Sequence, residues 1–173
     1  MRHSILMFAM LLLLSAAATA QIKVPGTNVT FDFPSSDWKF QKTFNYDKKT
    51  TAHLYAYIGK KFVDPTGEAT QPFMLVYAVK DYKQSIFDFI QKRYEQQPYW
   101  SIYEYMENIP GDEGMGHIAA YTNPSDQNDY KLQMIHFKDK NTAFEIRLET
   151  TIDTYDAMEE EFGAILKSVK ISQ

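Results

Sequence analysis

Alternation of apolar and polar residues predicts several β-strands with one buried face along this chain. The alternation is regular through residues 29–33, 38–46 and 144–149. Residues 53–58 and 100–106 are also strand-like, with a less regular pattern. Residues 73–79 are apolar at every position, which is typical of a central strand covered on both faces.

Helical spacing of apolar residues occurs twice. Ser85 is placed to cap a first helix that ends near residues 97–98. The residues expected to share its apolar face are Ile86, Phe87, Ile90 and Tyr94. Asp153 is placed to cap a second helix near the end of the chain. The apolar stripe of that helix consists of Met158, Phe162, Ile165 and Leu166.

The order of these elements predicts an α+β fold. Turn-forming residues at 123–126 and 139–141 join neighbouring strands as hairpins. The predicted order is four strands, a helix, four strands and a closing helix. Since no stretch after residue 20 has the composition of a linker, we expect residues 21–173 to form a single domain. A central, mainly antiparallel sheet flanked by the two helices is the natural packing for this order.

The first twenty residues have the pattern of a secretory signal peptide. Arg2 precedes an apolar run over residues 5–14, and Ala18-Thr19-Ala20 offers a small-x-small cleavage site. Ten helical residues reach only about 15 Å, half of a hydrocarbon core of about 30 Å. A short membrane anchor or a buried helix is the alternative. Cleavage would leave Gln21 as the first residue, and no later apolar run is long enough to cross a membrane.

Composition narrows the function classes. The 173 residues carry a formal net charge of −4, which disfavours binding to nucleic acid or to an anionic membrane by charge alone. The absence of cysteine excludes disulfides, thiol nucleophiles, thiolate metal sites and lipid attachment of the bacterial lipoprotein type. A secreted chain without disulfides fits a bacterial envelope, in the periplasm or beyond it.

Four segments of the chain resemble the PsbP-like family. VTFDFPSSDWKF is similar to the opening strands of that family, and FGAILKSVKI is similar to its closing helix. GHIAAYT and YKLQMIHFKDKNTAFEIRLET, which lie between them, resemble its consecutive hairpin strands. The similarity in element order covers roughly residues 28–171.

This resemblance implies an α/β/α sandwich and a non-enzymatic role. The family includes a photosystem II extrinsic subunit, a Ran-binding nuclear import factor and bacterial envelope proteins such as the DcrB group. Their shared property is binding or stabilising a protein partner. No partner-binding or metal-binding residue of the family matches a position in this chain, so none is transferred.

The sequence contains no catalytic motif of the hydrolase, zinc-protease or nucleotide-binding type. Carboxylate pairs such as Glu104 with Glu107, or Glu145 with Glu149, are the remaining candidates for catalysis. On a strand, Glu145 and Glu149 would lie about 13 Å apart, beyond the roughly 5–9.5 Å of glycoside hydrolysis. With Arg147 between them, they are better interpreted as a solvated ladder of charges. We therefore expect neither an enzyme nor a bound cofactor.

Two sets of residues have the composition of a metal site: a pair of histidines and a short polar segment. His117 and His136 are expected on nearby strands, where they would hold a divalent metal with a carboxylate, or each would be a half-buried strand residue. Residues 123–129 carry oxygen donors that suit calcium, but the same residue types are favoured in turns. The turn is the better interpretation, because the glycine and the distal glutamate of a calcium loop are missing.

An aromatic cluster is the main candidate for recognition. Tyr99, Trp100, Tyr103 and Tyr105 follow the first helix closely, and Trp and Tyr are good anchors for protein partners. Packing in the interior is the alternative. In a regular strand, Trp100 would face one way while Tyr103 and Tyr105 face the other.

The leading hypothesis is an exported accessory protein of the cell envelope that binds a protein partner. The alternative is a carrier of a small ligand or a metal.

Overall fold

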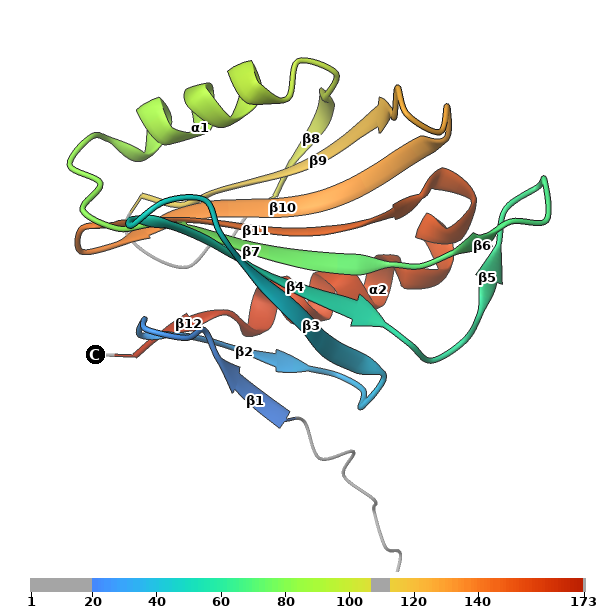
Figure 1. Ribbon diagram of the computed structural model, residues 1–173, viewed down its shortest axis with the longest axis horizontal. Coiled ribbons are helices and arrows are strands. Elements are labelled where there is room, and N and C mark those ends of the chain that lie inside the picture. Colours follow the sequence, from blue (N-terminus) through green and yellow to red (C-terminus); the bar gives the residue numbers. More distant parts are fainter. Residues whose placement is uncertain (1–19, 107–112, 173) are drawn as a thin grey trace, which may run out of the picture.

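The computed structural model describes residues 20–106 and 113–172 (Figure 1). Its strands are β1 (Ala20–Lys23), β2 (Val29–Phe33), β3 (Trp38–Asn45), β4 (Thr50–Tyr57), β5 (Phe62–Val63), β6 (Ala69–Thr70), β7 (Phe73–Val79), β8 (Ser101–Met106), β9 (Met115–Thr122), β10 (Asp129–Asp139), β11 (Thr142–Thr151) and β12 (Lys170–Ile171). Its helices are α1 (Ile86–Gln96) and α2 (Ile152–Ser168). The predicted signal peptide lies outside the described residues except for Ala20, which begins β1.

One large sheet organises the molecule. Seven strands pair antiparallel in the order β3-β4-β7-β11-β10-β9-β8. A smaller sheet has the order β1-β2-β12, and β5 pairs with β6 in a short hairpin. Both predicted turns are confirmed: residues 123–126 join β9 to β10, and Lys140, with a φ of 52°, lies in the turn from β10 to β11.

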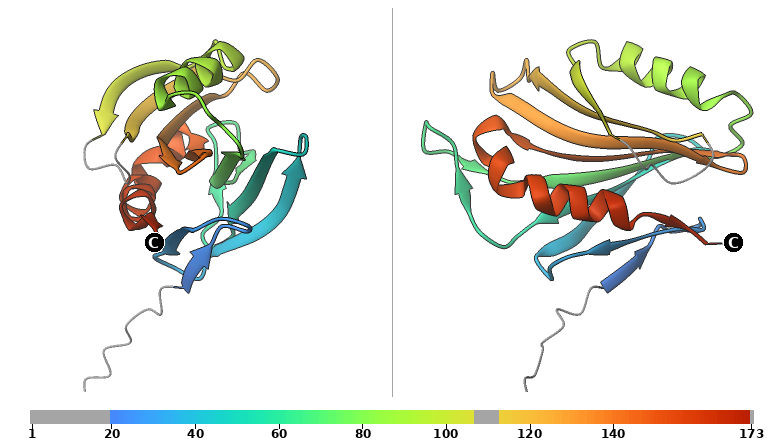
Figure 2. Two further views of the ribbon diagram at one scale, coloured as in Figure 1. Left: turned by 90° about the vertical axis from the view of Figure 1, so that its left-hand side faces the viewer. Right: turned by 180° about the vertical axis from the view of Figure 1, so that it is seen from behind.

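The large sheet separates the two helices. Figure 2 shows the sheet curling around α2, with the small sheet on the same inner side and α1 on the outer side. This arrangement confirms the predicted α+β class with a helix on each face. Within the part of the chain that the structure describes, neither helix combines the length and apolar character that a membrane crossing requires.

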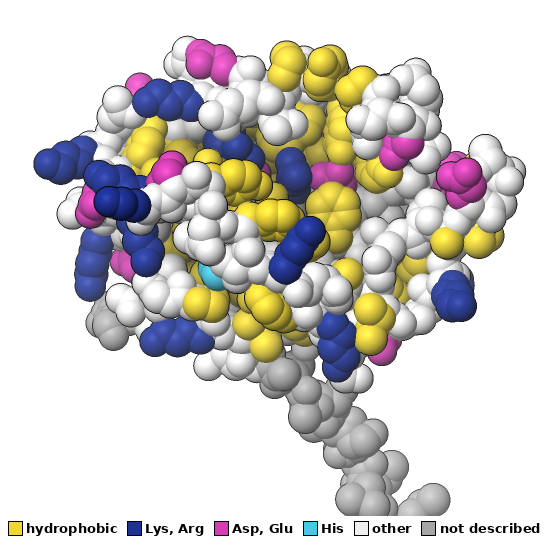
Figure 3. Space-filling model, in the orientation of Figure 1, with side chains coloured by type: hydrophobic (Ala, Val, Ile, Leu, Met, Phe, Trp, Pro, Cys, Tyr) yellow, Lys and Arg dark blue, Asp and Glu magenta, His cyan; other side chains and the backbone are white. Residues whose placement is uncertain are grey.

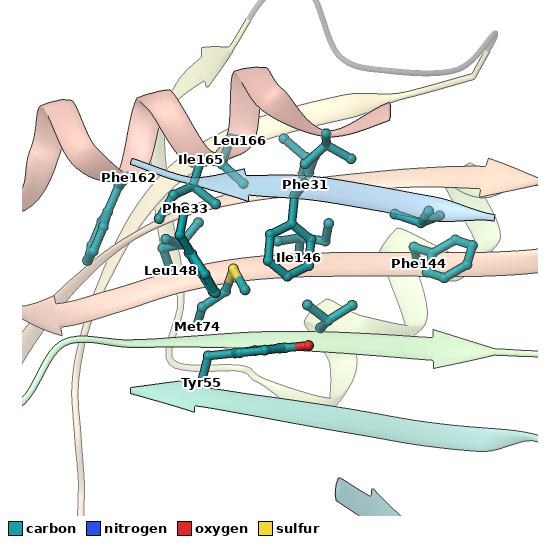
Figure 4. Close-up of a cluster of buried hydrophobic side chains, with 14 of the residues drawn as sticks. Phe31, Phe33, Tyr55, Met74, Phe144, Ile146, Leu148, Phe162, Ile165 and Leu166 are labelled. Atoms are coloured by element: carbon teal, nitrogen blue, oxygen red, sulfur yellow. The ribbon is translucent and has the colours of Figure 1, made fainter. Parts of the chain in front are cut away.

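The main core fills the space between the large sheet, α2 and the small sheet (Figure 4). The side chains that meet there include Phe31, Phe33, Tyr55, Met74, Phe144, Ile146, Leu148, Phe162, Ile165 and Leu166. Each fully buried side chain of this size stabilises the fold by about 1.5–3 kcal/mol. The stripe predicted on the second helix is confirmed, because Met158, Phe162, Ile165 and Leu166 are all buried.

The start of α1 follows the capping rules, and the start of α2 differs from the prediction. Ser85 caps α1 through a capping box, in which its hydroxyl accepts from the Asp88 N–H and the Asp88 carboxylate accepts from the Ser85 N–H, both at 3.1 Å. The prediction of Asp153 as the cap of α2 is wrong. The N-cap is Thr151, and Asp153 lies in the first turn, where a carboxylate also favours the helix dipole.

The buried face of α1 differs from the prediction. Its buried residues are Ile86, Phe89, Ile90 and Arg93. Phe87, expected on this face, is 65% exposed. Hydrophobicity alone could not place Arg93 in the interior, because its burial depends on a carboxylate contributed by the sheet.

Helix α1 covers only part of the outer face of the sheet. In β7, Met74, Val76 and Ala78 are buried toward α2. The other side chains of β7, which face outward, are only half-buried. Complete coverage of this strand was therefore a wrong expectation, and the uncovered outer face is where clefts form.

Candidate functional site: two clefts beside helix α1

A buried ion pair connects α1 to the sheet. Glu145 on β11 is 0% exposed and accepts hydrogen bonds from Arg93 Nε at 2.8 Å and Arg93 Nη2 at 2.9 Å. His136 Nε2 lies 3.1 Å from the same carboxylate. Burial alone would raise the pKa of Glu145, but the hydrogen bonds from His136 and Arg93 and the charge of Arg93 outweigh burial and lower it. Glu145 is therefore a charged structural anchor, which three hydrogen bonds hold in place away from solvent.

The two histidines of the predicted metal site lie next to each other beneath α1. The ring centroids of His117 and His136 are 5.7 Å apart, and His117 Nδ1 lies 2.9 Å from the Tyr94 hydroxyl. Burial and the neighbouring His136 lower the pKa of His117 to about 4, so its imidazole is neutral near pH 7. Across residues 20–106 and 113–172, no three His, Asp or Glu side chains are grouped as a metal site requires. A metal at this pair stays a prediction.

A second carboxylate of β11 is also buried. Glu149 is 1% exposed and accepts a hydrogen bond from the Tyr121 hydroxyl. Arg147 Nε lies 3.0 Å from Glu149 Oε2, at an angle too poor for a hydrogen bond. The expected solvated ladder of Glu145 and Glu149 is therefore wrong. Side chains from α1 and β9 cover these two carboxylates. The alternation of residues along β11 alone carries no information about which side chains from other elements will cover it.

A cleft of about 570 Å³ opens between α1, β7 and the turn from β3 to β4, and we call it the α1–β7 cleft. Its aromatic walls are Tyr46, Tyr77, Tyr82 and Phe89. Its charged lining residues are Asp47, Lys92, Arg93 and Arg147. Glu145 and Glu149 do not line it. The guanidinium groups therefore lie between these two carboxylates and the cleft, and give it a predominantly basic lining. Figure 3 shows basic and hydrophobic side chains side by side on this face of the molecule.

A groove of about 630 Å³ lies on the opposite side of α1, between the helix and strands β8 and β9, and we call it the α1–β8 groove. Apolar and aromatic side chains form most of its lining, including Phe87, Ile90, Ile102, Tyr105 and Met115. Among the described residues that line it, Glu95 is the only one with a formal charge at neutral pH. Helix α1 thus separates a basic cleft from an apolar groove with an acidic rim.

The predicted aromatic cluster divides between packing and exposure. Tyr99 is 58% and Tyr105 68% exposed, whereas Trp100 is half-buried against Tyr94. Tyr105 packs beside His117, so Trp100 and Tyr105 both lie on the α1 side of the sheet. Their expected placement on opposite faces is wrong, because Trp100 precedes β8 and the register shifts between Ile102 and Glu104. Tyr103 belongs to β8, and its side chain lies outside the described residues.

The sequence matches no protein-family model, and no curated protein sequence matches it. Solved structures match along most of its length. CyanoP, the PsbP of the cyanobacterium Synechocystis, has 9% identity and a TM-score of 0.54, over 90% of this chain and 94% of that one. This protein has the PsbP-like fold.

Two further matches support the PsbP-like fold. The Ran-binding protein Mog1p of Saccharomyces cerevisiae has 7% identity and a TM-score of 0.57, over 88% of this chain and 95% of that one. LpqN of Mycobacterium tuberculosis, involved in cell envelope biogenesis, has 11% identity and a TM-score of 0.52, over 90% of this chain and 91% of that one. At these identities the likeness concerns the fold alone.

Within this PsbP-like fold, several site residues were missed by sequence reasoning. Arg93 and Arg147 were not singled out as binding residues, and Phe87 was assigned to the core. One available signal was the position of Arg93 seven residues after Ile86, on the same helical face. The clefts themselves have no sequence signal, because they form between strands and a helix distant in the chain.

Proposed function

We propose that this protein is an exported, non-enzymatic accessory protein of the bacterial cell envelope, and that it binds an extended segment of a protein partner in the α1–β8 groove. The observation that carries this proposal is the position of the groove beside an edge strand. β8 ends the order of the large sheet, and in the described chain it pairs only with β9. Its outer backbone groups are therefore available to a further strand.

The lining of the groove suits such a strand. An added strand would direct alternate side chains toward α1, where Phe87 and Tyr105 are 65% and 68% exposed. Exposed apolar side chains of this size, gathered at one groove, are typical of interaction sites. The predicted partner-binding residues Tyr99 and Tyr105 both stay accessible at this end of the molecule.

Charge selects the kind of segment. Glu95 lines the groove, Glu104 is exposed on β8, and Glu113 is exposed just before β9. The lining of the groove carries no Lys or Arg among its described residues. Charge complementarity therefore favours a partner segment that alternates apolar residues with lysine or arginine.

Three further observations support the non-enzymatic role and the envelope. The buried ionisable groups beneath α1 are held by one another, as in the pair of Glu145 with Arg93. LpqN is involved in cell envelope biogenesis, and Mog1p is a Ran-binding protein. This fold therefore occurs both in a protein of the cell envelope pathway and in a protein that binds another protein. The predicted signal peptide supports export.

Site-specific photocrosslinking in the native cells tests this proposal. Benzoylphenylalanine placed at Phe87 or at Tyr105 is expected to yield the same discrete protein adduct. The matched control is Phe40, which is 54% exposed on β3 at the opposite edge of the sheet and should not yield it. The crosslinked segment, read by mass spectrometry, should alternate apolar and basic residues. Equal adducts from all three positions, or no adduct from the groove, would refute the proposal.

A further inference from the structure

We propose that the α1–β7 cleft is a second binding site, which takes a small carboxylic acid with an aromatic or apolar body. This inference is independent of the α1–β8 groove, because the two sites lie on opposite sides of α1 and share no lining residue. The residue that recognises the carboxylate is Arg147 on β11.

Arg147 presents unused hydrogen-bond donors to the cleft. Its side chain is 13% exposed, and its guanidinium lies 5.1 Å from the centroid of the Trp100 ring. Its Nε lies near Glu149, and neither of its Nη atoms donates to any described residue. A guanidinium held between an aromatic ring and a carboxylate is oriented in advance, and its fork binds a carboxylate through two parallel hydrogen bonds.

The other cations of the cleft have different roles. Arg93 donates to Glu145 through Nε and Nη2 and to Gln96 through Nη1, so all of its nitrogens are engaged. Lys92 is exposed, donates to Gln84 and adds positive charge at the side of the cleft. Arg147 is therefore the guanidinium that remains open to a ligand.

The acidic groups do not oppose an anion strongly. Asp47 is the one carboxylate among the described residues that line the cleft. Its Oδ1 accepts from the backbone N–H groups of Lys49 and Thr50 at 2.6 and 2.8 Å, which turns its charge toward the chain. These hydrogen bonds lower the pKa of Asp47.

The remaining surface of the cleft fits an apolar body. Leu75, Tyr77 and Phe89 provide apolar and aromatic walls, and the volume of about 570 Å³ lies within the range of small-molecule sites. The Tyr82 hydroxyl, buried at the same cleft, has no hydrogen-bond partner among the described residues. Buried polar groups are rarely unpaired in folded proteins, so a polar ligand atom is a suitable complement.

Nuclear magnetic resonance titration of the folded protein with 2-naphthoate, and with the uncharged 2-naphthamide, tests the inference. We expect the acid to bind at least about tenfold more tightly than the amide, because the carboxylate alone engages the guanidinium through charge-assisted hydrogen bonds. The perturbed amide signals should fall in α1, β7 and β11. In the Arg147→Gln variant, the preference for the acid should shrink to about twofold or less.

Two further variants keep the test decisive. Lys170→Gln removes the positive charge of an exposed side chain on β12 and should leave the preference unchanged. If Arg147→Gln fails to fold, the paired variant Arg147→Gln/Glu149→Gln removes both charges together and should lose the preference in the same way. Equal binding of the two probes, binding unaffected by these variants, signals outside the cleft or no saturable binding would each overturn the inference.

Discussion

Replacing Arg93 with methionine is expected to destabilise the protein by about 3 kcal/mol near neutral pH. The structural basis is Glu145, whose side chain is fully buried and would lose hydrogen bonds of 2.8 and 2.9 Å. Removing one partner of a buried ion pair costs about 3–5 kcal/mol, because the other charge is left without compensation. His136 remains 3.1 Å from the carboxylate, so the lower end of this range applies.

The loss should depend on pH in a defined direction. In the native protein the pKa of Glu145 is lowered, so its contribution is present above the unfolded pKa of about 4.3 and is lost as the pH falls. Without Arg93, only His136 opposes burial, which is the largest single influence on this carboxyl, and we expect burial to raise its pKa above the unfolded value. The variant should then lose stability as the pH rises through that raised pKa. The difference between the two proteins therefore grows from about pH 4 to about pH 7.

Urea unfolding at several pH values measures this difference. The double variant Arg93→Met/Glu145→Met should recover most of the lost stability, since neither charge remains buried alone. Lys49→Met is the matched control, because Lys49 and Asp81 form an exposed pair at 3.4 Å that contributes about 0–1 kcal/mol. The reasoning is refuted if Arg93→Met costs no more than this control, or if its cost is independent of pH.

Three other outcomes are expected. The pKa of His117 is lowered to about 4, so the unfolded chain takes up a proton before the folded protein does. As the pH is lowered from about 6.5 to about 4, the free energy of unfolding should therefore fall by up to about 1.4 kcal/mol per pH unit. Proton resonances of His117 that titrate above about pH 6 would contradict this. Ser85→Ala should cost about 1 kcal/mol in urea unfolding through loss of the capping box, whereas the exposed control Ser36→Ala should cost almost nothing. Mass spectrometry of the exported protein should find Gln21 at its N-terminus, and a chain that retains residues 1–20 would disprove the cleavage site.

Much of the secondary structure could be predicted because it depends on local chemistry. Alternation in residues 29–33 and 144–149 specifies strands wherever one face is buried. Ser85 and Asp88 specify the start of α1 through hydrogen bonds within a single turn. The strands β1 and β12 were not predicted, because such short segments acquire their structure from pairing with β2.

On the outer face of the sheet, the sequence predicts which residues share a face but not whether that face is buried. Period-two alternation places Glu145, Arg147 and Glu149 on one face of β11, and this much the sequence determined by itself. Whether that face meets water depends on α1, which lies about fifty residues away in the chain and brings Arg93 onto Glu145.

For the two clefts as well, local patterns in the sequence must be distinguished from burial and pairing, which depend on the tertiary structure. The sequence alone determined the longer strands, the helices and the α+β class, because backbone geometry and side-chain periodicity act over a few residues. Only the tertiary structure decided that Phe87 is exposed, that Glu149 is buried and that Arg147 faces a cleft. Burial and pairing are set by residues that folding brings together from distant parts of the chain, and no local pattern contains that information.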